Sequence, residues 1–222
     1  RERIDERNGN MRRIVTLLLI AGLFLSVSTS PTLAQTPDAK TMTFDVYLDG
    51  KKIGYHRFDI NGSENSAAVR SEASFDVKFL FITAFKYRHE ANESWTAGCL
   101  KEIEARTDSN GKQLQLSGEL TDSGFVVDTG KQEAELPDCV MTFAYWNPGF
   151  LDEARLLNPQ TGEYLDVDVT ELGSDVVEIG GREVQDRSVR LPARKMDISL
   201  WYSSDEQWLG MESVAIGGRI IR

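Results

Sequence analysis

The chain has 222 residues, of which 35 are acidic and 25 are Lys or Arg, so its formal net charge is −10 at pH 7. An acidic surface repels nucleic acid and anionic membrane faces, and neither is an expected partner. The length is sufficient for a domain with a substantial hydrophobic core.

The first 34 residues are not expected to belong to the folded domain. Residues 1–10 are polar and precede the first Met, so we interpret them as a start-site artefact or cloning scar. Residues 11–34 have the layout of a signal peptide, with a basic start, an apolar run and small residues before Ala34. The apolar run of about 14 residues is shorter than the roughly 20 that span a bilayer, although a retained anchor is an alternative. We therefore expect cleavage, a periplasmic location, no later transmembrane segment, and a single β-rich domain over residues 35–222.

From Thr41 onward the sequence alternates between apolar and polar residues, a pattern typical of half-buried β-strands. The dipeptides Asp49-Gly50 and Asn61-Gly62 predict turns between strands. Short strands separated by turns continue to the end of the chain and predict an antiparallel meander. One parity of the first strand is wholly apolar and is expected to face the core: Met42, Phe44, Val46 and Leu48.

One predicted strand carries both polar and aromatic residues on the same face. His89 and Glu93 lie on this same face, with Ala91 between them. They are weak candidates for a general base and its orienting acid, as in a hydrolase-like enzyme. The favoured interpretation is a polar pair at the rim of an aromatic surface, because the sequence positions no nucleophile beside them.

The two cysteines, Cys99 and Cys139, are predicted to form a disulfide, because an exported chain meets an oxidising compartment. The alternative, a redox-active pair, lacks the Cys-x-x-Cys spacing. The predicted bond would close a loop of about 40 residues, which chain-entropy arithmetic values at about 4 kcal/mol.

The segment that begins at Cys139 and ends near Leu157 is unusual in this β-rich sequence. Asn147-Pro148 favours a helix start, and Phe150, Leu151, Ala154 and Leu157 recur at roughly helical spacing. We therefore predict a mainly β fold: a strongly curved antiparallel sheet or half-open barrel with one short helix packed across it.

The hollow between this segment and the sheet is the predicted ligand site. Core packing alone would also explain its aromatic side chains. The predicted ligand-binding residues are Phe79, Phe81, Phe85, Tyr87, Trp95, Phe143, Tyr145 and Trp146.

The common catalytic and metal-binding motifs are missing from the sequence. It contains no nucleophile elbow, zinc-protease helix motif, phosphate loop or dinucleotide fingerprint. The histidines and cysteines lack zinc-site spacing, and Asp166, Asp168 and Glu171 do not match a calcium loop. We therefore expect neither metal nor cofactor.

The second half of the chain resembles an exported bacterial domain-of-unknown-function family. The resemblance is carried by Tyr145-Trp146-Asn147-Pro148, by the stretch from Leu156 to Glu163, and by Trp201-Tyr202 and Trp208, and the two cysteine positions also fit it. In architecture the predicted sheet is remotely similar to lipoprotein-localisation carriers, which shield acyl chains in a half-open barrel. That similarity implies a binding or carrier module for a lipid or another apolar or amphipathic molecule. An assembly factor that binds an envelope protein is the alternative.

Overall fold

The structure is a computed structural model that describes residues 39–79, 82–179, 182–193, 196–214 and 218–222. These residues belong to one compact unit, Thr36–Arg222. The predicted cloning scar and signal peptide lie outside the described residues. None of the helical segments in the described part of the chain has the length and apolarity that a bilayer crossing requires.

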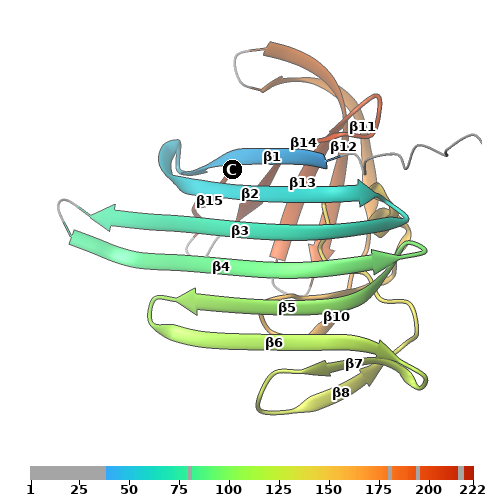
Figure 1. The fold of residues 1–222 in the computed structure, drawn as a ribbon. Coiled ribbons are helices and arrows are strands. Elements are labelled where there is room, and N and C mark those ends of the chain that lie inside the picture. The colour runs from blue at the N-terminus through green and yellow to red at the C-terminus, as the bar shows by residue number, and fades with distance from the viewer. Residues whose placement is uncertain (1–38, 80–81, 180–181, 194–195, 215–217) are drawn as a thin grey trace, which may run out of the picture. The chain divides into compact units, whose positions relative to one another are not determined.

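Most of the described chain forms one antiparallel sheet of 13 strands (Figure 1). Its order is β11-β12-β13-β14-β15-β1-β2-β3-β4-β5-β6-β7-β8, so two meanders meet where the last strand pairs with the first. The strands of the first meander are β1 (Ala39–Leu48), β2 (Lys51–Ser63), β3 (Ser66–Phe79), β4 (Ile82–Thr96), β5 (Cys99–Ser109), β6 (Lys112–Thr121), β7 (Gly124–Asp128) and β8 (Glu133–Leu136). Those of the second are β11 (Thr170–Ile179), β12 (Arg182–Ala193), β13 (Met196–Ser203), β14 (Trp208–Val214) and β15 (Ile220–Ile221).

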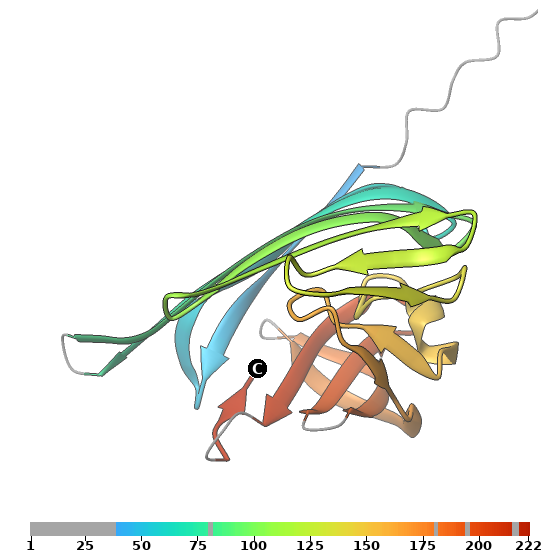
Figure 2. The same ribbon diagram turned by 90° about the horizontal axis from the view of Figure 1, so that it is seen from below.

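The two meanders are hydrogen-bonded to each other through a short stretch of β1 and β15. Leu48 in β1 is in register with Ile221 in β15, and Tyr47 and Arg222 exchange two backbone hydrogen bonds of 2.8 and 3.0 Å. Figure 2 shows the two meanders facing each other across the interior. The described strands do not form a closed barrel, because the sheet ends at β8 on one side and at β11 on the other.

The alternation seen in the sequence sorts residues between the core and the solvent. In β2, Phe58 and Ile60 are buried, whereas Arg57 points outward and forms an ion pair with Asp59 at 2.8 Å. The buried residues of both meanders make one hydrophobic cluster, in which Leu200 from β13 is fully buried. The prediction of a large, mainly antiparallel β fold is therefore confirmed.

The Asn61-Gly62 dipeptide does not form the predicted turn. β2 continues to Ser63, and Gly62 is in register with Ala67 of β3. A Cβ on Gly62 would lie 2.1 Å from the carbonyl oxygen of Ser66, and the Gly62 φ angle is +121°. The glycine therefore permits a close approach of two strands rather than a chain reversal. By contrast, Asp49 and Gly50 both have positive φ, as the predicted two-residue hairpin turn requires.

The predicted disulfide is present. The Cys99 and Cys139 sulfurs are 2.00 Å apart, and they connect the start of β5 to the segment that follows β8. Next to them, the Leu100 N–H donates a 2.9 Å hydrogen bond to the Val140 carbonyl. Together these two connections hold the segment against the sheet.

The predicted short helix across the sheet is not confirmed. Asn147 does cap a helical start, since its side chain accepts a hydrogen bond from the Gly149 N–H, but only a five-residue 3₁₀ helix, Pro148–Asp152, follows. From Glu153 the backbone is extended, with ψ of 140°. Tertiary pairing overrides the helical spacing, because the Leu157 N–H bonds to the Met141 carbonyl at 2.8 Å. The chain then forms a small separate sheet from β9 (Arg155–Leu157) and β10 (Tyr164–Asp166).

Candidate ligand-binding cavity

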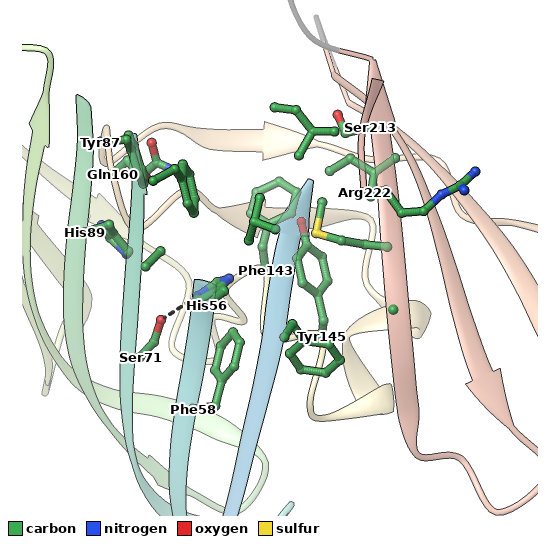
Figure 3. Close-up of a pocket in the computed structure, with 18 of the residues that line it drawn as sticks. His56, Phe58, Ser71, Tyr87, His89, Phe143, Tyr145, Gln160, Ser213 and Arg222 are labelled. Carbon is green, nitrogen blue, oxygen red and sulfur yellow. Dashed lines mark hydrogen bonds between the residues drawn. The ribbon is translucent and has the colours of Figure 1, made fainter. Parts of the chain in front are cut away.

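A cavity of about 1380 Å³ lies inside the domain. Its walls come from the inner face of β1 to β4, from residues 142–146, and from strands β13 to β15 (Figure 3). Small-molecule sites commonly enclose about 300–1000 Å³, so this space can hold a large ligand.

The hollow arises from small side chains in the middle of the β2–β5 face. The sheet register places Phe58, Ser71, Ala91 and Ala105 in one row across four strands. Ser71 and Ala91 line the cavity between larger neighbours, so the surface is recessed where they lie. A row of Leu or Phe at these positions would fill the space with side chains.

Aromatic rings form much of the wall. Phe75 and Tyr87 stack with their centroids 4.7 Å apart on β3 and β4. On the other side, Trp208 of β14 lies 4.2 Å from the Phe44 ring and 5.2 Å from the Tyr145 ring. Trp208 therefore connects both meanders and the segment after the disulfide, which closes one side of the cavity.

We call residues 140–147 the flap, because they run along the cavity between the two meanders. The Tyr202 hydroxyl of β13 donates a 3.0 Å hydrogen bond to the Tyr145 carbonyl. The Asn147 side chain donates to the Glu64 carbonyl at 3.3 Å in the β2–β3 turn. The flap is thus held from both meanders, and its aromatic side chains have fixed backbone positions.

Glu93 is a buried carboxyl group on the cavity wall. It accepts hydrogen bonds from the Trp95 indole at 3.1 Å and from the Thr142 hydroxyl of the flap at 3.2 Å. Burial raises the pKa of Glu93 to about 7, although both hydrogen bonds oppose that change. A neutral carboxylic acid is therefore well populated at this site near neutral pH.

The two histidines of the chain both line the cavity. His89 Nδ1 lies 2.8 Å from the Thr107 hydroxyl, and His56 Nε2 lies 3.1 Å from the Ser71 hydroxyl (Figure 3). Burial lowers the pKa of His89 to about 4 and that of His56 to about 3, the latter with a smaller contribution from His89. Both rings are therefore neutral at physiological pH.

The weak catalytic candidates His89 and Glu93 line the same cavity but are not bonded to each other. Thr107 orients His89, and the bonds of Glu93 go to Trp95 and Thr142. The geometry therefore lacks the acid–base contact that a paired general base would use.

The predicted ligand-binding residues occupy three kinds of position. Five line the cavity: Phe85, Tyr87, Phe143, Tyr145 and Trp146. Trp95 lies outside the lining, buried in the core with its ring 5.7 Å from Trp146. Phe81 and the side chain of Phe79 lie outside the described part of the structure.

Several lining residues were not among the predicted ligand-binding residues. Phe44 lies on the strand face that alternation predicted to be inward, and His56 and Phe58 lie on the inward face of the next strand. Ser71 and Trp208 could not be found in this way, because the recess and the wall depend on pairings between distant strands.

The part of the chain that the structure describes contains no group of three or more His, Cys, Asp or Glu that could hold a metal ion. The cavity surface instead consists of aromatic and aliphatic side chains with a few hydrogen-bonding groups, which is the composition of a small-molecule site.

The fold and the cavity define a β-barrel-like protein with an open antiparallel sheet around an internal space. The chain belongs to the family described as Domain of unknown function (DUF6134), whose model matches residues 44–221. Its fold is similar to the crystal structure of a β-barrel-like protein of the domain of unknown function DUF1849 from Brucella abortus. That match has a TM-score of 0.60 and 11% identity, and it covers 84% of this chain and 95% of the other. A search among curated proteins found no match.

Proposed function

We propose that the protein is an exported, periplasmic binding or carrier module for an apolar or amphipathic molecule such as a lipid. The observation that carries the proposal is the cavity of about 1380 Å³ lined by aromatic side chains of both meanders and the flap. Each CH₂ group moved from water into such a space contributes about 0.8 kcal/mol, so a single acyl chain supplies ample binding energy.

The location rests on two features. The signal-like layout of residues 11–34 favours export, and a disulfide between Cys99 and Cys139 persists in an oxidising compartment. The proposed carrier would therefore work between membranes, where an apolar molecule needs shielding from water.

Native mass spectrometry tests the proposal directly. The chain is expressed with its leader in a bacterium and purified from the envelope fraction, and its mass is measured before and after organic extraction. We expect adducts with the masses of lipids, together with displacement of a bound fluorescent lipid by the extract. Protein that is free of adducts and takes up no fluorescent lipid contradicts the proposal.

A second candidate, an envelope assembly factor, is favoured by a difference between the two edges of the sheet. The β8 edge carries exposed Glu133 and Glu135, charges that discourage strand pairing. The β11 edge also carries an exposed acid, Glu171, but in addition it presents two large apolar side chains, Leu172 at 57% exposed and Val176 at 59% exposed. This edge suits an added strand from an envelope protein.

The test of this second candidate is photocrosslinking in cells with the reactive residue at position 172. We expect a discrete protein adduct from position 172 and none from position 135. Equal crosslinking from both edges, or from neither, contradicts a strand-pairing partner at β11.

A further inference from the structure

Each histidine uses one ring nitrogen inside the cavity wall and leaves the other unpaired. His56 Nε2 bonds to Ser71 and His89 Nδ1 to Thr107, while His56 Nδ1 and His89 Nε2 have no partner among the described residues. His89 is only 6% exposed, so the accessible surface of its second nitrogen is small. Buried nitrogens of this kind are costly unless a ligand or water reaches them.

Neither nitrogen is enclosed by protein atoms. Among the described residues, the one fully enclosed side-chain polar atom without a partner is Ser94 Oγ. Both histidines belong to the cavity lining, and Figure 3 shows both rings on the cavity wall. The unpaired nitrogens therefore face the space that a ligand would occupy.

The sheet register places the two rings on either side of a small residue. His56 is opposite Ala73, and Ala73 is opposite His89, across β2, β3 and β4. Two strand spacings of about 4.8 Å separate the histidine backbones by roughly 10 Å. The side chain of Ala73 is a single methyl group, and all three residues line the cavity, so the position above Ala73 is where a polar group of a ligand would lie between the two rings.

The hydroxyl groups that bond to the two histidine rings leave each ring free to adopt either neutral tautomer. A hydroxyl can donate or accept, so Ser71 and Thr107 are compatible with either neutral tautomer of the ring they contact. Each inward nitrogen can consequently present an N–H to a carbonyl or a lone pair to a hydroxyl.

The charges of the lining oppose an anionic ligand group. Its arginines are Arg219 and Arg222, which form ion pairs with Asp49 and Glu212 at its edge. The Glu93 carboxyl, on the same strand as His89, is a further acidic group in the cavity lining. A carboxylate or phosphate between the two rings would thus be buried without a counter-ion, at a cost of several kcal/mol.

We propose that the ligand carries an uncharged oxygen group, a hydroxyl or an ester or amide carbonyl, that hydrogen-bonds to His56 and His89 above Ala73. This inference rests on the proposed function and narrows it from apolar molecules in general to neutral amphiphiles. The remainder of the ligand lies along the aromatic wall formed by Phe75 and Tyr87.

Competition binding with matched probes tests the proposal. The neutral fluorophore N-phenyl-1-naphthylamine is bound to the purified chain at pH 8 and displaced by 1-monolauroylglycerol or by laurate, which share one acyl chain. Three variants are compared with the unchanged chain. H56F/H89F removes the two unpaired ring nitrogens that face the cavity. Ala73→Leu fills the space between the rings but retains these nitrogens. Tyr55→Phe changes an outward residue of β2 and is the control.

We expect the unchanged chain and Tyr55→Phe to bind monolauroylglycerol at least tenfold more tightly than laurate, which corresponds to about 1.4 kcal/mol. H56F/H89F and Ala73→Leu should each reduce that preference about tenfold. Since H56F/H89F also removes two hydrogen bonds within the wall, Ala73→Leu tests the subsite without that loss. Circular dichroism verifies folding of every variant.

Three results would overturn the inference, and they are distinguishable. If the unchanged chain binds the fluorophore but laurate competes as well as monolauroylglycerol, a neutral oxygen is not recognised and the carrier proposal stands. If the chain binds neither fluorophore nor acyl chain, the proposed function fails as well. A preference that persists in both H56F/H89F and Ala73→Leu places the polar group elsewhere and contradicts the subsite.

Discussion

The Thr142 hydroxyl donates a hydrogen bond of 3.2 Å to the Glu93 carboxyl, and this contact joins the flap to the C-terminal part of β4. Its two partners are 49 residues apart in the chain. The bond lies inside the cavity wall, so the ionisation of one buried acid bears on how the flap is held.

Glu93→Gln is predicted to change the pH dependence of stability. Because burial raises the pKa of Glu93 from 4.5 to about 7, the folded state holds its proton more tightly than the unfolded state. The resulting stability is fully present below pH 4.5 and is lost as pH rises through 7, to a total of about 3 kcal/mol. Glutamine does not titrate, and its carbonyl oxygen can accept from the Trp95 indole while its NH₂ group donates to the Thr142 hydroxyl.

Urea unfolding at pH 5 and pH 8 measures this effect. The free energies of unfolding of the original chain and Glu93→Gln should be close at pH 5, and the variant should be the more stable of the two at pH 8. A difference between the two proteins that is the same at both pH values contradicts a raised Glu93 pKa.

Local patterns in the sequence predicted the parts of the fold that depend on local chemistry. Alternation placed Phe44 and Leu48 on the inner face of β1, and the cysteine content predicted the bond between Cys99 and Cys139. The helix prediction was wrong beyond Asp152 because the pairing of Leu157 with Met141 is set by tertiary structure.

The cavity depends on relationships that a pattern of hydrophobicity does not contain. Nothing in the hydrophobic pattern distinguishes the small strand residues Ser71, Ala73 and Ala91. Only the strand register shows that they lie in adjacent rows of the sheet. Trp208 reaches Phe44 because β15 pairs with β1, a contact between the ends of the domain. Aromatic residues of the flap and of β4 were identifiable, whereas the small residues of β3 and the wall formed by Trp208 were not.

Removal of the disulfide is predicted to destabilise the protein without changing the cavity chemistry. The Cys99→Ala and Cys139→Ala double variant loses a cross-link that spans 40 residues, worth about 4 kcal/mol by loop entropy. Urea unfolding under oxidising conditions measures the loss. The original chain treated with reductant should unfold at the same urea concentration as the variant. A loss below about 1 kcal/mol would mean that the flap is held by its other contacts.

Asn147→Ala is predicted to destabilise the flap. The side chain caps the 3₁₀ helix through Gly149 and also donates to the Glu64 carbonyl, and Asn147 is 2% exposed. Loss of a cap and a buried hydrogen bond costs about 2 kcal/mol in unfolding free energy. Asn158→Ala is the matched control, because Asn158 accepts one turn hydrogen bond from the Gln160 N–H and is partly exposed. Equal losses in the two variants would contradict the dual role of Asn147.

Ala91→Leu is predicted to reduce ligand uptake by occupying the recess. Ala91 lines the cavity, and its neighbours in the register row are Ser71 and Ala105, so a leucine at this position extends into open space. The affinity for N-phenyl-1-naphthylamine should fall at least tenfold, while the added apolar contact limits the change in stability to about 1 kcal/mol. Ala84→Leu is the control, because Ala84 is exposed on the same strand. Fluorescence titration of both variants measures the affinities. Unchanged binding by Ala91→Leu would show that the fluorophore occupies another part of the molecule, and the recess would then not be the ligand site.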